Sequence, residues 1–305
     1  MLQNIGSLEE LIMRYSTQLS FLARKYGHIK GADMLMDAGF TAIDITIHGR
    51  YDSPDTVILK TPIYSDEYES FARELRERAE ARGAVYNQAH APFPSETKIE
   101  LLPRAIEFAG LLGVKTIVVH PSLALEYYHN EEATYEHNME FYSSLVPYAK
   151  DAGVKIGIEN TYRLHKVTNR ICDTAGSSTE ELCRYYDTLK DTGVFTICLD
   201  VGHAALCGRE PADVIRDLGH ERLGALHMHD VDYIDDLHHL PGTSKLKFTE
   251  ICRALGEIDY TGDVTLEADR FYSGFDEDFY PEAAKFMAKT AKHLAELVDS
   301  YRNNK

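Results

Sequence analysis

CLDVGHAALCG, residues 198–208, begins the part of the chain that decides its fold, and LGALHMHDVD (223–232), DDLHHLPG (235–242) and DVTLEAD (263–269) complete it. Short apolar runs in this part end in a carboxylate or a histidine, and so does the earlier run VKIGIE (154–159). Short apolar runs that are rich in β-branched residues and bounded by loops indicate buried strands. The residues at the ends of these runs are Glu159, Asp200, His227 and Glu267. The pattern predicts strands that deliver polar side chains to the loops that follow them.

The same alternation of strand and helix runs through the rest of the chain. The predicted strands are residues 16–22, 41–47, 84–90, 115–120, 154–159, 194–200, 222–229 and 261–267. The predicted helices are residues 28–38, 66–82, 96–112, 131–152, 178–191, 211–218, 248–258 and 281–301. Several of them end before a glycine, which is a common helix stop. A further helix is predicted within residues 1–14, and a loop at residues 48–65.

Strands that alternate with helices in this way predict a parallel sheet of the α/β class. Continuous apolar strands such as TIVVH (116–120) suit a sheet that is buried on both faces. Eight such units favour a single (β/α)8 TIM barrel, whose usual size is about 250 residues. No linker divides the chain, so residues 1–305 are predicted to form one domain. The alternative is an open doubly wound sheet, which the absence of a glycine-rich nucleotide-binding fingerprint disfavours.

Composition limits the classes of function. The formal net charge is −17, which disfavours nucleic acids and anionic membranes as partners because binding to phosphates relies on Lys and Arg. No apolar run approaches the roughly 18 residues of a membrane span, and the first residues lack a secretory signal. The five cysteines form no C-x-x-C pair. We therefore expect reduced thiols in a cytoplasmic protein.

The polar strand ends predict a metal site. In a (β/α)8 barrel, side chains at the carboxyl ends of the strands surround the active site. A lone glutamate there is usually a solvated carboxylate or a helix cap, and a lone histidine is often part of the core. Four unpaired ionisable groups near the barrel axis would be unfavourable, however, and a divalent cation removes that penalty. The predicted ligands are Glu159, Asp200, His227 and Glu267.

Further polar residues follow the same or neighbouring strands. Candidates for additional metal ligands or substrate-binding groups are His90, His120, His203, Asp236 and His238. Arg163 and Arg270 each follow a glutamate of the set, and they are candidates for substrate contacts or for surface salt bridges. His229 and His239 stand beside candidate residues and are assigned no role.

These motifs resemble the xylose isomerase-like TIM barrel superfamily. The relevant branch is the sugar phosphate isomerase/epimerase family, related to D-tagatose 3-epimerase, inosose dehydratase and endonuclease IV. The resemblance covers most of the chain, from about His28 onward. Its motifs are IGIENT around Glu159, D-x-x-H at Asp200 and His203, a match to H-x-K-D beginning at His227, D-x-H at Asp236 and His238, and VTLEAD around Glu267.

The resemblance implies a metal-dependent isomerase or epimerase that acts on a small carbohydrate-like substrate. A divalent ion (Mn²⁺, Mg²⁺, Co²⁺ or Zn²⁺) is expected at Glu159, Asp200, His227 and Glu267. Glu159 and Glu267 are then the catalytic pair. One removes the proton next to a carbonyl, giving a metal-stabilised cis-enediolate, and the other returns a proton. His203 would hydrogen-bond the substrate, and pairing into a homo-oligomer is a further expectation.

Departures from the family pattern leave the reaction open. The epimerases have an arginine after the metal histidine, where this chain has Tyr233 and its neighbours, and His165 lies near the place of an acid–base glutamate. Epimerisation, isomerisation, and dehydration or a lyase reaction on an oxo-sugar or inosose all remain candidates. A rival is a phosphodiesterase of the endonuclease IV type, because the metal-site candidates reproduce its order of ligands around three zinc ions. The acidic charge disfavours that rival. A metal-binding barrel without catalysis is a third alternative.

Overall fold

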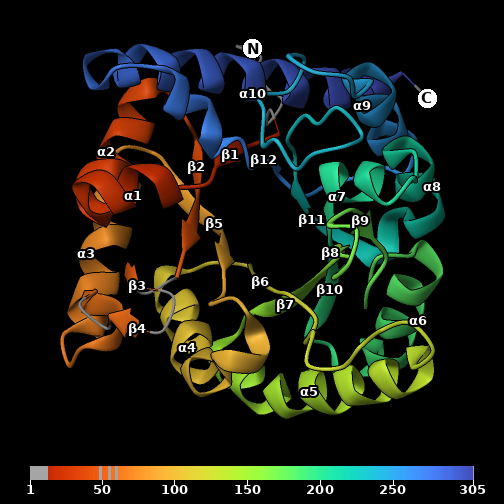
Figure 1. The fold of residues 1–305 in the computed structure, drawn as a ribbon. Coiled ribbons are helices and arrows are strands. Elements are labelled where there is room, and N and C mark those ends of the chain that lie inside the picture. Colours follow the sequence, from red (N-terminus) through yellow and green to blue (C-terminus); the bar gives the residue numbers. More distant parts are fainter. Residues whose placement is uncertain (1–12, 48–49, 54–55, 59–60, 305) are drawn as a thin grey trace, which may run out of the picture.

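A computed structural model describes residues 13–47, 50–53, 56–58 and 61–304 of the chain. Its central parallel strands form a ring with helices outside (Figure 1). Strands β11, β10, β7, β6, β5 and β2 lie side by side in that order, and β1 pairs with β12. Parallel bridges from Gln18 to Asp44 and from Met228 to Leu266 join this pair to both edges of the larger sheet. The strands therefore follow one another around a barrel, which confirms the predicted α/β barrel.

The barrel strands among the described residues lie close to their predicted positions, with one exception. They are β1 (Tyr15–Thr17), β2 (Ala42–Thr46), β5 (Val85–His90), β6 (Thr116–Val119), β7 (Lys155–Glu159), β10 (Phe195–Asp200), β11 (Leu223–His227) and β12 (Val264–Leu266). Every residue of β2, β6 and β10 is buried. Such strands need apolar or hydrogen-bonded side chains on both faces, as parallel barrel strands do.

The helices that cover the barrel lie at the predicted positions, but α4 begins at Leu102 rather than at residue 96, and α8 extends to Arg222 rather than ending at residue 218. They are α2 (His28–Ala38), α3 (Tyr68–Glu80), α4 (Leu102–Leu112), α5 (Glu131–Ala152), α6 (Thr179–Leu189), α8 (Pro211–Arg222), α9 (Phe248–Glu257) and α10 (Tyr280–Asn303). Helices α4 and α5 end at Gly113 and Gly153, whose φ angles of 80° and 67° suit glycine. The chain between the strands also contains 3₁₀ turns: η1 (Pro62–Tyr64), η2 (Ser95–Thr97), η3 (Ile99–Leu101), η4 (Lys190–Thr192), η5 (Asp269–Gly274) and η6 (Glu277–Phe279).

The strand predicted at residues 16–22 is wrong in its second half. Strand β1 ends at Thr17, and helix α1 (Ser20–Tyr26) follows almost at once. Leu19 and Leu22 are both buried, and their spacing of three residues is that of a helix face rather than of a strand. The helix predicted within residues 1–14 lies outside the described residues, except for the last two positions.

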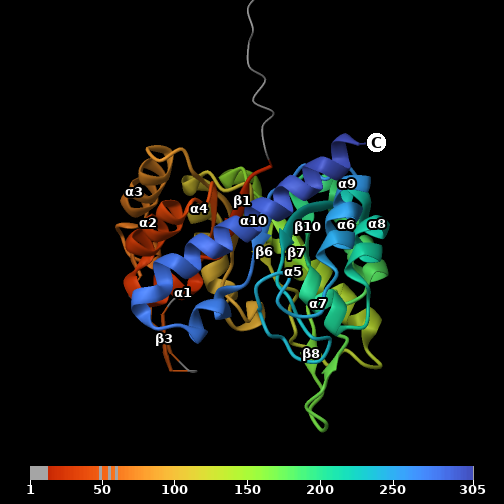
Figure 2. The ribbon, with the colours of Figure 1, turned by 90° about the horizontal axis from the view of Figure 1, so that it is seen from above.

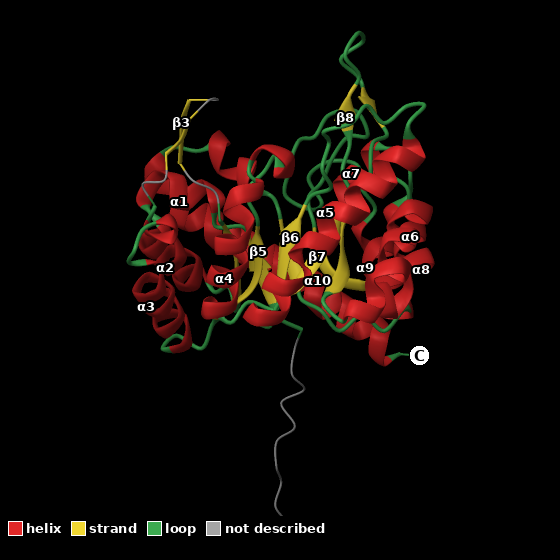
Figure 3. Cartoon of the chain, turned by 90° about the horizontal axis from the view of Figure 1, so that it is seen from below, coloured by secondary structure: helices red, strands yellow, loops and turns green. Residues whose placement is uncertain are grey.

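Irregular elements lie mainly at the carboxyl ends of the strands. Strands β3 (Arg50–Ser53) and β4 (Thr56–Ile58) form a hairpin where the sequence predicted only a loop. Strands β8 (Arg163–Leu164) and β9 (Ile171–Cys172) form another hairpin, which projects from the body (Figure 2). Figure 3 shows β3 and β8 on the same side of the molecule. Directly after β10 comes the short helix α7 (Val201–Leu206), which the sequence did not predict.

Two further features concern the cysteines and the helices. All five cysteines are free thiols, as predicted. Among the described residues, no helix combines the length and apolar character that crossing a bilayer requires.

Candidate metal centre

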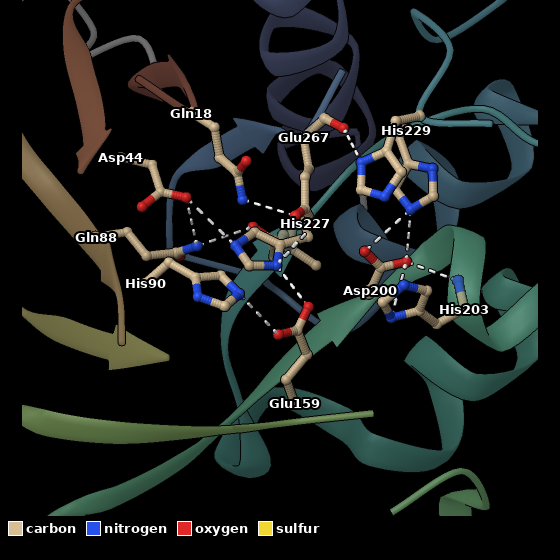
Figure 4. Close-up of polar contacts among 12 residues, drawn as sticks. Gln18, Asp44, Gln88, His90, Glu159, Asp200, His203, His227, His229 and Glu267 are labelled. Atoms are coloured by element: carbon tan, nitrogen blue, oxygen red, sulfur yellow. Dashed lines mark hydrogen bonds and ion pairs between the residues drawn. The ribbon is translucent and has the colours of Figure 1, made fainter. Parts of the chain in front are cut away.

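The central group of four predicted ligands forms where the strands end. Glu159, Asp200 and His227 are the last residues of β7, β10 and β11, and Glu267 directly follows β12. One ligand atom from each lies within 4.8 Å of the others. The first three side chains belong to fully buried residues, and Glu267 is 8% exposed. Figure 4 shows these side chains pointing toward one another from different strands.

His227 links the two glutamates of the central group. Its Nδ1 lies 2.6 Å from Glu159 Oε1 and 3.1 Å from Glu267 Oε2. Burial alone would lower the pKa of His227, but Cys198, Glu267 and Glu159 hold it well above its usual range. Burial would raise the pKa of Glu159, but His227 and His120 hold it well below its usual value. Burial raises the pKa of Glu267. Nδ1 of His227 therefore faces the carboxylates of both glutamates.

The donor set of the central group fits a divalent cation. Three buried carboxylates face one central imidazole, and uncompensated buried charge is strongly unfavourable. Glu159 Oε2 and Glu267 Oε2 are buried and make no hydrogen bond among the described residues, although histidine nitrogens lie nearby. Carboxylate oxygens together with an imidazole nitrogen suit Mn²⁺, Co²⁺ or Zn²⁺. These four residues would hold the ion.

An inner cluster of His90, His120 and Glu159 adjoins the central group. His90 ends β5, and His120 directly follows β6. Their Nε2 atoms lie 3.0 Å apart, and His120 Nε2 lies 2.8 Å from Glu159 Oε2. His90 Nδ1 lies 3.0 Å from the carbonyl oxygen of Ala91, which turns its Nε2 toward Glu159. Glu159 is therefore shared by the inner cluster and the central group.

An outer cluster forms on the opposite side of Asp200. It consists of His203, His229, Asp236 and His238, with one ligand atom from each within 4.8 Å of the others. His203 lies on α7, and the other three follow β11. The loop that carries them is anchored at Asp230, whose carboxylate accepts hydrogen bonds from the backbone N–H groups of Gly242, Ser244 and Leu246. Sequence analysis assigned His229 no role, yet it contacts Asp200.

Other buried polar residues support the centre and were not predicted. Asp44 Oδ2, on β2, lies 3.3 Å from His227 Nε2, and Gln18 donates to Glu267 Oε1 at 2.7 Å. Gln88 makes a long contact of 3.5 Å with Asp44. The sequence did contain a signal for these residues, because each is a polar residue inside or next to an apolar strand. A polar residue needs a hydrogen-bond partner when it is buried. The identity of that partner depends on how the barrel closes.

The two candidate arginines have protein partners. Arg163, on the β8 hairpin, contacts Glu126 at 3.5 Å and donates to the carbonyl oxygen of Leu125. Arg270 donates to the carbonyl oxygen of Asp236 at 2.6 Å, so it helps to hold the loop of the outer cluster. The carboxylate of Asp236 in turn accepts from the Tyr162 hydroxyl at 3.0 Å.

The chain is thus a parallel α/β barrel with a buried cluster of potential metal ligands at the carboxyl ends of its strands. The family model for the xylose isomerase-like TIM barrel matches residues 32–290, and the chain belongs to this family. An uncharacterized protein of Methanocaldococcus jannaschii is 29% identical over an alignment of 231 residues, which covers 71% of this chain and 74% of that protein.

Solved structures of sugar epimerases share the fold. A D-tagatose 3-epimerase-like protein superposes with a TM-score of 0.70 and 23% identity, covering 94% of this chain and 99% of that one. A D-psicose 3-epimerase in the presence of D-fructose gives a TM-score of 0.67 and 18% identity, covering 93% and 99%. The 3-keto-D-glucoside 4-epimerase from E. coli gives a TM-score of 0.62 and 16% identity, covering 91% of this chain and 99% of that one. At these identities the likeness establishes the fold alone.

Proposed function

We propose that this protein is a metal-dependent isomerase or epimerase of a small carbohydrate or sugar phosphate. The observation that carries the proposal is the central group, in which Glu159 and Glu267 approach one imidazole nitrogen from different strands. Membership of the family supports it, as does the presence of a D-tagatose 3-epimerase-like protein and a D-psicose 3-epimerase among the structural neighbours. The ion would be Mn²⁺, Mg²⁺, Co²⁺ or Zn²⁺.

The proposed reaction moves a proton at a carbon next to a carbonyl. Bound at the central group, a divalent ion supplies positive charge that stabilises the negative charge developing on the substrate oxygens. Glu159 and Glu267 act as acid and base on that carbon. Their surroundings shift their pKa values in opposite directions, below the usual value for Glu159 and above it for Glu267.

Residues around the central group suit a polar substrate. His90 and His120 stand on one side and His203 on the other, and all three are more than nine-tenths buried. Their imidazole nitrogens can orient hydroxyl groups or a phosphate. We propose that the partner is a small carbohydrate rather than nucleic acid or a membrane. We also propose that the protein forms a homo-oligomer and is located in the cytoplasm.

Solvent exchange of a substrate hydrogen tests the proposal. Metal-loaded protein is incubated in D₂O with ketoses, oxo-sugars and inososes, both free and phosphorylated. We expect deuterium next to the carbonyl of at least one of them, measured by NMR, and Glu159→Gln and Glu267→Gln should abolish its uptake. Glu100→Gln, a change on the exposed surface, is the control. Loss of water with exchange would identify a dehydratase. Absence of exchange on the whole panel would contradict proton abstraction.

A phosphodiesterase is the second candidate, and one observation favours it. The predicted ligands fall into a central group, an inner cluster and an outer cluster, and several adjacent ions suit phosphoryl transfer. The net charge of −17 opposes a nucleic-acid substrate. Hydrolysis of a phosphodiester such as bis(4-nitrophenyl) phosphate by metal-loaded protein, without deuterium exchange on any sugar, would favour this candidate.

A further inference from the structure

A ladder of side-chain hydrogen bonds runs along the paired strands β1 and β12. The register of this pair sets Ser16 opposite Thr265, and their hydroxyl oxygens lie 2.9 Å apart. Two residues further along both segments, Gln18 Nε2 donates to Glu267 Oε1 at 2.7 Å (Figure 4). Successive side chains on one face of a strand are two residues apart. Gln18 and Glu267 therefore form the second rung of this ladder, just beyond the ends of the two strands.

The second rung is held in place from both sides. The backbone N–H of Gln18 donates to the carbonyl oxygen of Leu266 at 3.0 Å. Two residues further on again, Ser20 Oγ donates to Asp269 Oδ2 at 2.7 Å and forms a third rung. Gln18 is 7% exposed and Glu267 is 8% exposed. The position of Gln18 is thus fixed by the backbone and by the rungs before and after it.

This hydrogen bond determines how the two side chains are turned. A carboxylate only accepts hydrogen bonds, so the amide nitrogen of Gln18 faces Glu267 and the amide oxygen points away. With Oε1 of Glu267 engaged by Gln18, the other oxygen is left for the centre of the barrel. Glu267 Oε2 is buried, makes no hydrogen bond among the described residues and lies 3.1 Å from His227 Nδ1.

An amide suits this position because it is neutral. A lysine or an arginine could also turn the carboxylate of Glu267, but its positive charge would oppose a divalent ion at the central group. The amide of Gln18 fixes the orientation of the carboxylate and leaves its negative charge for the ion. Hydrogen bonds of this kind orient the ligands of metal sites.

We propose that Gln18 is a positioning residue for Glu267, which it holds by Oε1 so that Oε2 alone faces the ion of the central group. This role rests on the proposed function and deepens it, because it names the oxygen through which Glu267 acts. Loss of a group that orients a ligand typically reduces metal affinity by about 10- to 100-fold. We expect a loss of that size at the central group when the amide of Gln18 is removed.

Cobalt binding tests this role without any sugar. The metal-free chain is titrated with Co²⁺, whose visible absorption depends on the number and geometry of its ligands. Comparison of wild type with Glu267→Gln identifies the absorption that belongs to the central group. Gln18→Leu, a change of similar size, should weaken binding of that ion and alter its absorption, because the freed carboxylate can turn. Unchanged affinity and an unchanged spectrum in Gln18→Leu would overturn the proposal.

A double variant shows whether Gln18 acts through Glu267. Combined with Glu267→Gln, Gln18→Leu should reduce cobalt affinity no further, because the carboxylate that it positions is gone. Ser16→Ala is the matched control: it removes the first rung of the same ladder without touching Glu267, and it should bind cobalt as wild type does. Equal losses in Ser16→Ala and Gln18→Leu, or the same loss with and without the carboxylate, would mean that Gln18 only joins the strands.

A crystal structure of the cobalt-loaded wild type decides the question if Gln18→Leu does not fold. Cobalt bound by Oε2 of Glu267, with Oε1 on Gln18, supports the proposal. Cobalt bound by Oε1 or by both oxygens rejects it. None of these measurements needs a substrate, so a chain that binds cobalt in this way and exchanges no substrate hydrogen would contradict the proposed reaction and support the role of Gln18.

Discussion

The central group and the outer cluster are built on different supports. Three ligands of the central group end strands β7, β10 and β11, and Glu267 directly follows β12. Their backbone is fixed by hydrogen bonds to neighbouring strands, as in the register that pairs Asp200 with His227. The outer cluster draws His203 from a short helix and Asp236 and His238 from a loop. In that loop, His238 has a φ of 46°.

The difference indicates how each site tolerates change. Side chains on strands of a closed barrel keep their positions because moving them would disrupt the core. Side chains on a loop depend on a few named contacts, here the carboxylate of Asp230, the Tyr162 hydroxyl and Arg270. We therefore expect large effects from changes to the central ligands and graded effects from changes around the outer cluster.

The largest effect is expected for Glu159→Gln. The change removes the carboxylate that the central group and the inner cluster share, while the strand and its packing remain. Acid–base groups of this kind typically contribute about 10²- to 10⁴-fold to rate, so turnover of a substrate found in the exchange screen should fall by that factor. Asp236→Asn is the comparison from the outer cluster and should reduce turnover less. Equal losses in both variants would contradict the division between the two sites.

Removal of metal should lower stability. A ligand that binds only the folded state stabilises it, by about 2.7 kcal/mol at a free concentration of 100 times Kd. We expect a chelator to lower the melting temperature and zinc to restore it. Glu267→Gln should reduce this gain, since the central group loses a ligand. An identical melting curve with and without chelator would argue against metal binding at either site.

The strand-borne ligands were predictable from sequence. A buried parallel strand leaves a clear pattern, so β7 and β10 lie within one residue of their predicted limits, and their last residues are the predicted Glu159 and Asp200. The loop residues Asp236 and His238 were named as candidates because they follow the strand that ends in His227, and they also match the motif of the family. The sequence pattern alone could not place a loop beside a strand end, because loop paths depend on tertiary contacts.

The residues and the strand limits that the sequence did not predict correctly also have physical explanations. His229 lies two residues after His227, and a period of two places both side chains on the same face of a strand, so this signal was available. Asp44 was hidden inside the apolar run of β2, and its partner His227 is remote in sequence. The strand predicted at residues 16–22 extends too far because a buried turn of helix and a buried strand have similar composition.

Asp44→Asn should have an intermediate effect, confined to the central group. Asp44 faces His227 Nε2 at 3.3 Å, so it holds the ring with Nδ1 toward the two glutamates. Loss of such a supporting carboxylate typically reduces metal affinity by 10- to 100-fold. We expect that loss for the central ion in calorimetric titrations, with binding at the outer cluster unchanged. Asp33→Asn, outside the barrel, is the control. Weaker binding at both sites would mean that Asp44 supports the barrel rather than His227.

The smallest effect is expected for Tyr162→Phe, which removes only a hydroxyl. That hydroxyl donates to Asp236 Oδ2 at 3.0 Å from a half-buried ring. Such a hydrogen bond contributes about 0.5–1.5 kcal/mol, so affinity for an ion held by the outer cluster should fall by roughly tenfold at most. The central ion should bind as in wild type, because none of its ligands contacts Tyr162 among the described hydrogen bonds. Tyr148→Phe, on the exposed face of α5, is the matched control. A loss of affinity at the central group equal to that at the outer cluster would show that the two sites respond as one unit, and the contrast between strand-borne and loop-borne ligands would then fail.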